Sequence, residues 1–261
     1  MNCKNCHTDL QENDDYCKNC GGKVIRKRLS FKNLFEHLSE TFFNYDNKLL
    51  RTFVQLIKNP EDVIVGYING VRKKYINPIS FFGLSLTLSG LSIFIIKKFY
   101  LEHFDFSKMF EEITVNQDIM ANNTFEGVLE YNSLFYAFLI PLFALISWVV
   151  FLNKKYNFTE HIIIYLYSIS FLSILFVLIA QVVLIVAPES YMSFSFLSWP
   201  LMFIYNCYIL TRIFKLSFWD LILRSIIFFA LFFVAYIIIS FAVFFIMLGT
   251  GAINLEDFRP K

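Results

Sequence analysis

Residues 225–253 read SIIFFALFFVAYIIISFAVFFIMLGTGAI, without a single charged side chain. About 20 apolar residues are enough to cross the roughly 30 Å hydrocarbon core of a bilayer, so this stretch predicts a transmembrane helix. The chain holds four similar stretches before it, at residues 78–96, 133–152, 161–187 and 191–211. The alternative is that the five stretches are core helices of a soluble protein. A soluble protein of 261 residues is too small to bury five helices that are apolar on every face. The sequence therefore predicts an all-α integral membrane protein with about five transmembrane helices.

The rest of the chain differs in composition. The whole sequence is 57% hydrophobic and holds 33 Phe, above the 45–50% apolar content of an ordinary soluble domain. Most of this excess lies after residue 77, which indicates a polar head followed by a membrane domain. We predict a zinc ribbon at 1–23, juxtamembrane amphipathic helices on the cytosolic side at 24–77, a helical transmembrane domain at 78–253 and a short tail at 254–261.

Four of the five cysteines lie in the first 20 residues, at Cys3, Cys6, Cys17 and Cys20. Each Cys-x-x-Cys pair folds into a tight turn with both thiolates on one side, and two such turns supply the four sulfur ligands of a tetrahedral Zn²⁺. So short a segment cannot bury enough core to fold alone, so the metal would supply the folding energy. The spacing predicts one structural zinc ion.

Other readings of the cysteines remain open. Two disulfides would need an oxidising compartment, and a redox pair or an iron site could also use Cys-x-x-Cys. His7 adjoins the first pair and could compete as a ligand, although four cysteines already complete the set. Cys207 stands alone in an apolar stretch and is interpreted as a small buried residue.

The distribution of charge predicts the topology. If the N-terminus is cytoplasmic, 18 of the 23 Lys and Arg residues fall on the cytoplasmic side of five spans and 5 on the other. Positive residues concentrate on the cytoplasmic side of membrane proteins. The sequence therefore predicts a protein of the inner (cytoplasmic) membrane, with the N-terminus in the cytoplasm and the C-terminus outside.

The segment before the first span shows a helical pattern. Apolar residues recur at three- and four-residue intervals from Leu34 to Phe53, which predicts amphipathic helices over 29–58 that lie against the membrane surface rather than extending into the cytosol. Asn59 and Pro60 are typical of a helix start, and the pattern predicts a further helix from there towards Lys74.

The stretch from Asn59 to Pro78 resembles a bacterial family of multi-pass membrane proteins defined only as a domain of unknown function. The resemblance lies in an N-terminal zinc ribbon and a set of residues leading into the first span: Pro60, Tyr67, Gly70, Arg72, Lys73, Tyr75 and Pro78. Glu61 departs from the glycine expected beside Pro60. The resemblance covers about the first 95 residues and implies the architecture, without implying an activity.

The spans hold few polar groups that could carry chemistry. Gln181 and Asn206 are the deep ones, and interhelical hydrogen bonding explains them more simply than substrate contact. Glu160 and His161 could form an acid/base pair at the end of the third span, although a solvated interfacial position explains them too. The sequence predicts no catalytic set and no cofactor beyond zinc.

The leading interpretation is a non-enzymatic scaffold or docking protein. Its partners would be the lipid bilayer and either a cytosolic protein or a second copy of the chain. The few basic residues beside the cysteines do not indicate nucleic acid. A small-solute transporter or channel is the first alternative, and a membrane-lipid enzyme that uses Glu160 and His161 is the second.

Overall fold

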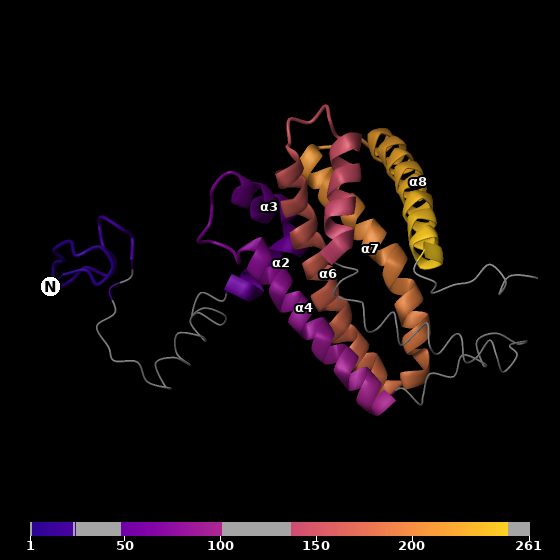
Figure 1. Cartoon of the computed structure of the whole chain (residues 1–261), viewed down its shortest axis with the longest axis horizontal. Coiled ribbons are helices and arrows are strands. Elements are labelled where there is room, and N and C mark those ends of the chain that lie inside the picture. The colour runs from indigo at the N-terminus through magenta and orange to yellow at the C-terminus, as the bar shows by residue number, and fades with distance from the viewer. Residues whose placement is uncertain (1, 23, 25–47, 101–136, 250–261) are drawn as a thin grey trace, which may run out of the picture. The chain divides into compact units, whose positions relative to one another are not determined.

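The computed structural model describes residues 2–22, 24, 48–100 and 137–249 (Figure 1). The chain separates into two compact units, Met1–Lys48 and Leu49–Lys261. Parts of the predictions lie outside the described residues: 25–47 of the predicted amphipathic segment, 133–136 of the second predicted span, 250–253 of the last one, and the tail at 254–261.

The first unit is a small cluster of turns. An isolated antiparallel β-bridge joins Asn2 and Asp9, and the described residues of this unit hold no β-strand. A turn between the two cysteine pairs is fixed by Asp14, whose carboxylate accepts a hydrogen bond from the amide of Gln11 at 2.9 Å. Cys3, Leu10 and Cys17 form its buried centre.

The described part of the second unit is helical. Two short helices come first, α2 (Lys48–Lys58) and α3 (Pro60–Ile68). The long helix α4 (Pro78–Ile95) follows and ends in the π-helical turn η1 (Ile96–Tyr100).

The remaining helices follow residue 136. They are the helix Ala137–Val150, α6 (Phe158–Val186), the short η4 (Pro188–Ser190), α7 (Tyr191–Phe214) and α8 (Phe218–Gly249).

Four helical segments are long and apolar enough to cross a membrane: Pro78–Phe99, Phe158–Val186, Pro188–Phe214 and Phe218–Ala242. They match four of the five predicted spans, and α6 and α8 begin earlier than predicted. The remaining predicted span, 133–152, is described as the shorter apolar helix Ala137–Val150. The described residues therefore hold four candidate membrane-spanning helices, which indicates a membrane protein.

Helix α6 is at the centre of the bundle. It packs against α4 along its length and also contacts α3 and α7. Tyr165, Tyr167 and Phe171 are among its fully buried side chains. None of the described side chains of α8 is buried, and each of them is half-buried or exposed. A bilayer accounts for such exposure, because lipid tails solvate apolar side chains.

The segment before the first span is built into the same core. Leu56 of α2 and Val63 and Ile64 of α3 are fully buried, and the ring of Phe53 lies 4.5 Å from that of Phe171 in α6. Burying one such side chain contributes about 1.5–3 kcal/mol. The described end of the amphipathic stripe therefore packs against the helices of the second unit, and not against the membrane surface as predicted.

Helix α3 is shorter than predicted. It ends at Ile68 rather than continuing towards Lys74, because Gly70 adopts a φ of 97°, which turns the chain out of the helix. The side chain of Asn59 does not cap α3 either, because its oxygen accepts a hydrogen bond from Arg212 at 3.0 Å.

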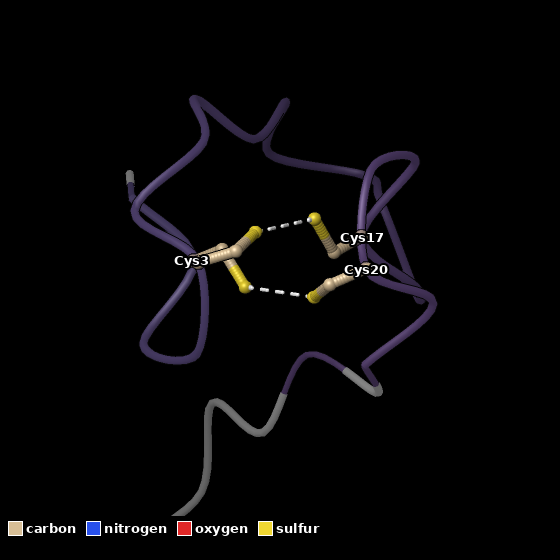
Figure 2. Close-up of side chains that lie close together, drawn as sticks. Cys3, Cys17 and Cys20 are labelled. Carbon is tan, nitrogen blue, oxygen red and sulfur yellow. Dashed lines mark hydrogen bonds between the residues drawn. The ribbon is translucent and has the colours of Figure 1, made fainter.

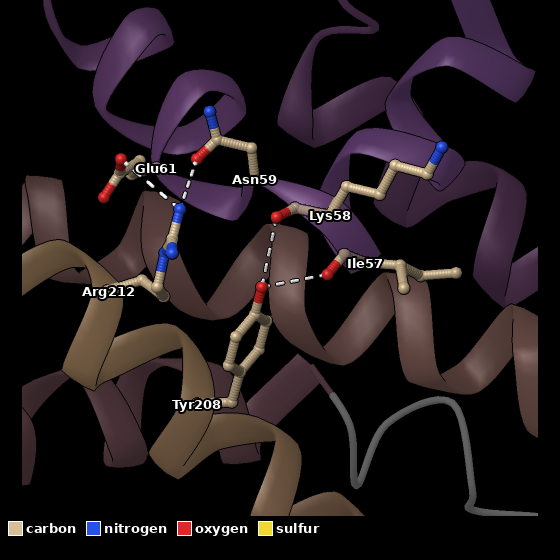
Figure 3. Close-up of polar contacts among 6 residues, drawn as sticks. All are labelled: Ile57, Lys58, Asn59, Glu61, Tyr208 and Arg212. Carbon is tan, nitrogen blue, oxygen red and sulfur yellow. Dashed lines mark hydrogen bonds and ion pairs between the residues drawn. The ribbon is translucent and has the colours of Figure 1, made fainter.

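Three helix ends are closed by side chains from other elements. Figure 3 shows the first, where the Tyr208 hydroxyl of α7 donates to the last carbonyls of α2, those of Ile57 and Lys58. Arg224 of α8 donates to the carbonyl of Val150 at 2.6 Å, ending the helix Ala137–Val150. The ammonium of Lys154 donates to the carbonyl of Phe214, at the end of α7, at 3.0 Å. These contacts place the three helix ends at the same end of the bundle.

Candidate metal centre

The first cysteine turn is held by two backbone hydrogen bonds. The amide of His7 donates to the carbonyl of Cys3, and the amide of Cys3 donates to the carbonyl of Thr8, both at 2.9 Å. His7 has a φ of 60°, a left-handed conformation that only a few residue types adopt readily. This turn brings the thiols of Cys3 and Cys6 to one side.

The second cysteine turn repeats that pattern fourteen positions later. The amide of Gly21 donates to the carbonyl of Cys17 at 2.8 Å, and the amide of Cys17 donates to the carbonyl of Gly22 at 2.9 Å. Gly21 has a φ of 67°, so it corresponds in conformation to His7. The two turns are therefore one structural unit used twice.

The four thiols converge between the two turns (Figure 2). The sulfur atoms of Cys3, Cys6, Cys17 and Cys20 all lie within 4.8 Å of one another. Cys3 faces Cys20 with a sulfur–sulfur distance of 3.7 Å, and Cys6 faces Cys17 at 3.5 Å. A disulfide bond has a length near 2.05 Å, and all four cysteines are free. This set of sulfur atoms could hold a metal ion.

Hydrogen-bond donors favour the thiolate form at two of the four sulfurs, those of Cys6 and Cys20. The side chain of Thr8, with its hydroxyl 3.2 Å from the Cys6 sulfur, and the Thr8 backbone lower the pKa of Cys6 to about 6. The backbone of Gly22 and the side chain of Asn5 lower the pKa of Cys20. A metal binds the thiolate, so these donors prepare the site.

Thr8 was not singled out by the sequence analysis. Its hydroxyl lies between the Cys6 sulfur and the side-chain amide of Asn19, which donates to it at 3.1 Å. The spacing of the sequence could have pointed to Thr8. It stands two residues after Cys6, just as Gly22 stands two residues after Cys20. A β-carbon on Gly22 would lie 3.4 Å from the Cys20 sulfur, so the glycine leaves room for the thiol.

The other polar residues of the helical unit have separate partners. Gln181 donates to the hydroxyl of Ser92 at 2.6 Å, joining α6 to α4. The oxygen of Asn206 accepts from the hydroxyl of Ser168 at 2.7 Å, joining α7 to α6. Both side chains therefore make the interhelical hydrogen bonds that the sequence favoured. The thiol of Cys207 faces the hydroxyl of Ser225 at 3.8 Å.

Glu160 and His161 do not act as a pair in this structure. The carboxylate of Glu160 accepts from the amide of Asn157 at 2.7 Å, while the Asn157 side chain accepts from the amide of Glu160, forming a capping box at the start of α6. His161 is fully buried, and its Nδ1 lies 3.0 Å from the hydroxyl of Ser147. Neighbouring positions on a helix point in different directions, which explains the separation.

Residues 46–90 match the family described as "Protein of unknown function (DUF3667)". The match takes in α2, α3 and the first part of α4, and it stops short of the cysteine module on one side and of α6 on the other. It confirms the resemblance to a domain of unknown function for this segment. No curated protein and no solved structure matches the chain.

The matched segment has a well-defined polar surface around α3. The ammonium of Lys74 lies 2.6 Å from the carboxylate of Asp62, which also accepts a hydrogen bond from the hydroxyl of Tyr75. These contacts with Lys74 and Tyr75 lower the pKa of Asp62. Arg72 stacks over the ring of Tyr67 at 4.2 Å. Several of the residues that carried the resemblance therefore fix the turn between α3 and α4.

Proposed function

We propose that this chain is a multi-pass membrane protein whose N-terminal residues 1–23 bind one structural zinc ion and serve as a docking module. The convergence of four thiols from two matched turns carries the proposal. With zinc–sulfur bonds of about 2.3 Å, the corners of a tetrahedron lie about 3.8 Å apart, close to the 3.5 and 3.7 Å between the facing sulfurs.

A site with four sulfur ligands leaves no coordination position for a substrate. Such zinc sites are structural, whereas catalytic zinc keeps an open position for water. The head would therefore present a surface rather than perform a reaction. Tyr16 supports this role, because its side chain is 58% exposed on so small a unit and tyrosine is enriched at protein interfaces. The partner would be a cytosolic protein or a second copy of the chain.

We further propose five spans, with the N-terminus in the cytoplasm of a bacterial inner membrane and the C-terminus outside. The helix Ala137–Val150 would belong to the second span, which the sequence predicts at residues 133–152. The helix ends that carry Lys154, Arg212 and Arg224 all meet at the end of the bundle that holds α2 and α3. This clustering of cations supports the cytoplasmic assignment of that end.

Metal analysis of the purified full chain tests the zinc proposal. One zinc per chain is expected under reducing, chelator-free conditions, and Cys6→Ser should remove most of it. Cys207→Ser is the matched control, because it removes a thiol from a helix of the other unit. A content near zero in the unmodified protein, or equal content in both variants, would contradict the proposal.

The docking role needs its own test. A photo-crosslinking residue at position 16 should give one discrete adduct in cells, and Cys6→Ser should abolish it while the amount of protein in the membrane stays constant. An adduct of twice the chain mass would identify self-association. No adduct in the otherwise unmodified protein, or an equal adduct in Cys6→Ser, would contradict docking through this unit.

Transport of a small solute is the second candidate, and one observation favours it. A cavity of about 250 Å³ between α4, α6 and α7 is lined in part by hydroxyl groups, from Ser89, Ser92, Ser173, Ser195 and Ser198. Ser89 and Ser173 bond to each other at 2.9 Å across the helices. Replacing Ser195 by Leu would narrow the cavity and leave that bond intact. Loss of a solute flux at normal abundance would favour transport over docking.

A further inference from the structure

A second cavity lies on the other side of α7, between that helix, the helix Ala137–Val150 and α8. Its volume is about 420 Å³. Its wall is built mainly from aromatic rings: Phe143, Phe151, Trp199, Phe203, Phe228 and Phe232. An apolar cavity of about 150 Å³ already binds benzene, so this space is large enough for a flexible hydrocarbon chain.

Apart from Arg224, the polar groups of this wall that lie on α7 are already paired within the protein. The side-chain oxygen of Asn206 accepts from Ser168, and its nitrogen donates to the carbonyl of Met202 at 2.8 Å. The Cys207 thiol faces Ser225. A polar solute would find almost no free hydrogen-bonding group here, which favours an apolar occupant.

One end of the cavity carries a fixed cation. The guanidinium of Arg224 donates through Nη1 to the carbonyl of Val150 at 2.6 Å and through Nη2 to the side chain of Asn153 at 3.2 Å. It also lies 4.8 Å from the centre of the Phe151 ring. A guanidinium has five N–H donors, so these contacts hold the group in place and leave donors for an anion.

Arg224 directly precedes the uncharged stretch 225–253, so we place it at the boundary between headgroups and acyl chains. It stands six residues after Phe218, where α8 begins, or about 9 Å along a helix that rises 1.5 Å per residue. Phe232 stands about 12 Å further along the same helix. The cavity therefore extends from a cation at the polar boundary into the depth of the hydrocarbon layer.

We propose that this cavity binds one anionic phospholipid, with its phosphate on Arg224 and an acyl chain among the aromatic rings. Arginine and phosphate form paired, charge-assisted hydrogen bonds, and a volume in this range is typical of small-ligand sites. Because no described side chain of α8 is buried, lipid can reach the cavity from the bilayer. The site is independent of the zinc head and of the proposed docking role.

Native mass spectrometry of the full chain tests the proposal. The protein would be released from mixed micelles that contain equal amounts of phosphatidylglycerol and phosphatidylcholine with the same acyl chains. The unmodified protein should retain one phosphatidylglycerol in preference to phosphatidylcholine. Arg224→Gln should weaken that retention roughly tenfold, the cost of about one charged hydrogen bond. Cys207→Leu keeps the arginine but fills the cavity, and it should weaken retention of the same lipid.

Lys155→Gln is the matched control, because it removes one positive charge at the same end of the bundle from an exposed side chain. It should leave retention unchanged, and glycerol phosphate should not compete, since it lacks the acyl chain. Equal retention by Arg224→Gln and the unmodified protein would overturn the proposal. Equal losses in Lys155→Gln, competition by glycerol phosphate, or a lipid-free dimer whose interface protects the cavity would also overturn it.

Discussion

The hydroxyl of Tyr208 lies 2.9 Å from the backbone carbonyl oxygen of Ile57, although 151 residues separate the two in the chain. The last carbonyls of a helix have no partner within the helix, so a spanning helix here satisfies the end of α2. Tyr205, one turn earlier in α7, donates in the same way to the carbonyl of Leu56 at 3.1 Å. The segment matched by the family is therefore fastened to a membrane helix outside the match.

Replacing Tyr208 by Phe should lower the free energy of unfolding by about 1 kcal/mol, because it removes the hydroxyl and leaves carbonyls without that donor. Tyr205→Phe should have a similar effect. Tyr236→Phe is the control, since that side chain is 60% exposed on α8. Thermal unfolding of the purified protein measures all three. A control as destabilising as the two test variants would contradict the assignment.

Substitutions at Gly21 and at His7, the matched positions of the two cysteine turns, should change the zinc affinity in opposite directions. Gly21→Ala places a β-carbon at a φ of 67°, which costs about 1–2 kcal/mol and should weaken zinc affinity about 5- to 30-fold. His7→Gly relieves the same conformation at a φ of 60° and should retain or improve the affinity. It also removes the imidazole, so it tests whether His7 is a ligand. Competition with a chelator of known affinity gives both values, and a large loss in His7→Gly would identify the histidine as a ligand.

The ion pair of Asp62 and Lys74 should make stability depend on pH at both extremes. The pKa of Asp62 lies below its ordinary value of 3.8, so its contribution is complete above that value and is lost as pH falls through the lowered pKa. The pKa of Lys74 is raised above 10.5 by the same contact, so its contribution is lost as pH rises through the raised pKa. Asp62→Asn should flatten the unfolding profile at both ends, whereas Glu189→Gln, at an exposed site, should not.

Five spans would place the two termini on opposite sides of the membrane. Reporter fusions after Lys155 and at Lys261 should therefore report the cytoplasm and the outside, respectively. Four spans would instead place both termini on the same side, so a cytoplasmic signal at Lys261 would show that the helix Ala137–Val150 does not cross. A fusion within the first unit calibrates the cytoplasmic signal.

Much of the fold could be predicted because hydrophobicity is a local property of the sequence. Uncharged stretches identified the four long spans to within a few residues at most ends. The start of α8 was missed because Arg224 interrupts the apolar stretch, although Ser217 and Asp220 form a helix-start pattern seven residues earlier. The start of α6 was missed for a related reason, since the capping pair Asn157 and Glu160 is polar.

The contacts between helices could not be predicted in the same way. Nothing in the local sequence distinguishes Tyr208, which caps α2, from Tyr236, which faces outward. Whether a tyrosine donates to a distant carbonyl depends on how the helices pack. The convergence of the cysteines was the opposite case, because all four lie within one short segment whose spacing brings their sulfur atoms together. The positive φ of His7 could not be predicted from the sequence, because that position does not carry the glycine that usually indicates this conformation.

The hydrogen bonds from α7 to α2 also determine when, during synthesis, α2 can complete its folding. Leu56 leaves the ribosome 149 residues before Tyr205. At roughly 5–20 residues per second, the α2 carbonyls wait on the order of ten seconds for their donors. Until the helix that carries Tyr205 has been synthesised and inserted, the N-terminal segment cannot reach its final state. If synthesis stops before that point, the last carbonyls of α2 have no hydrogen-bond donors from α7. Proteases or chaperones that recognise this exposed helix end would then distinguish unfinished chains from complete ones.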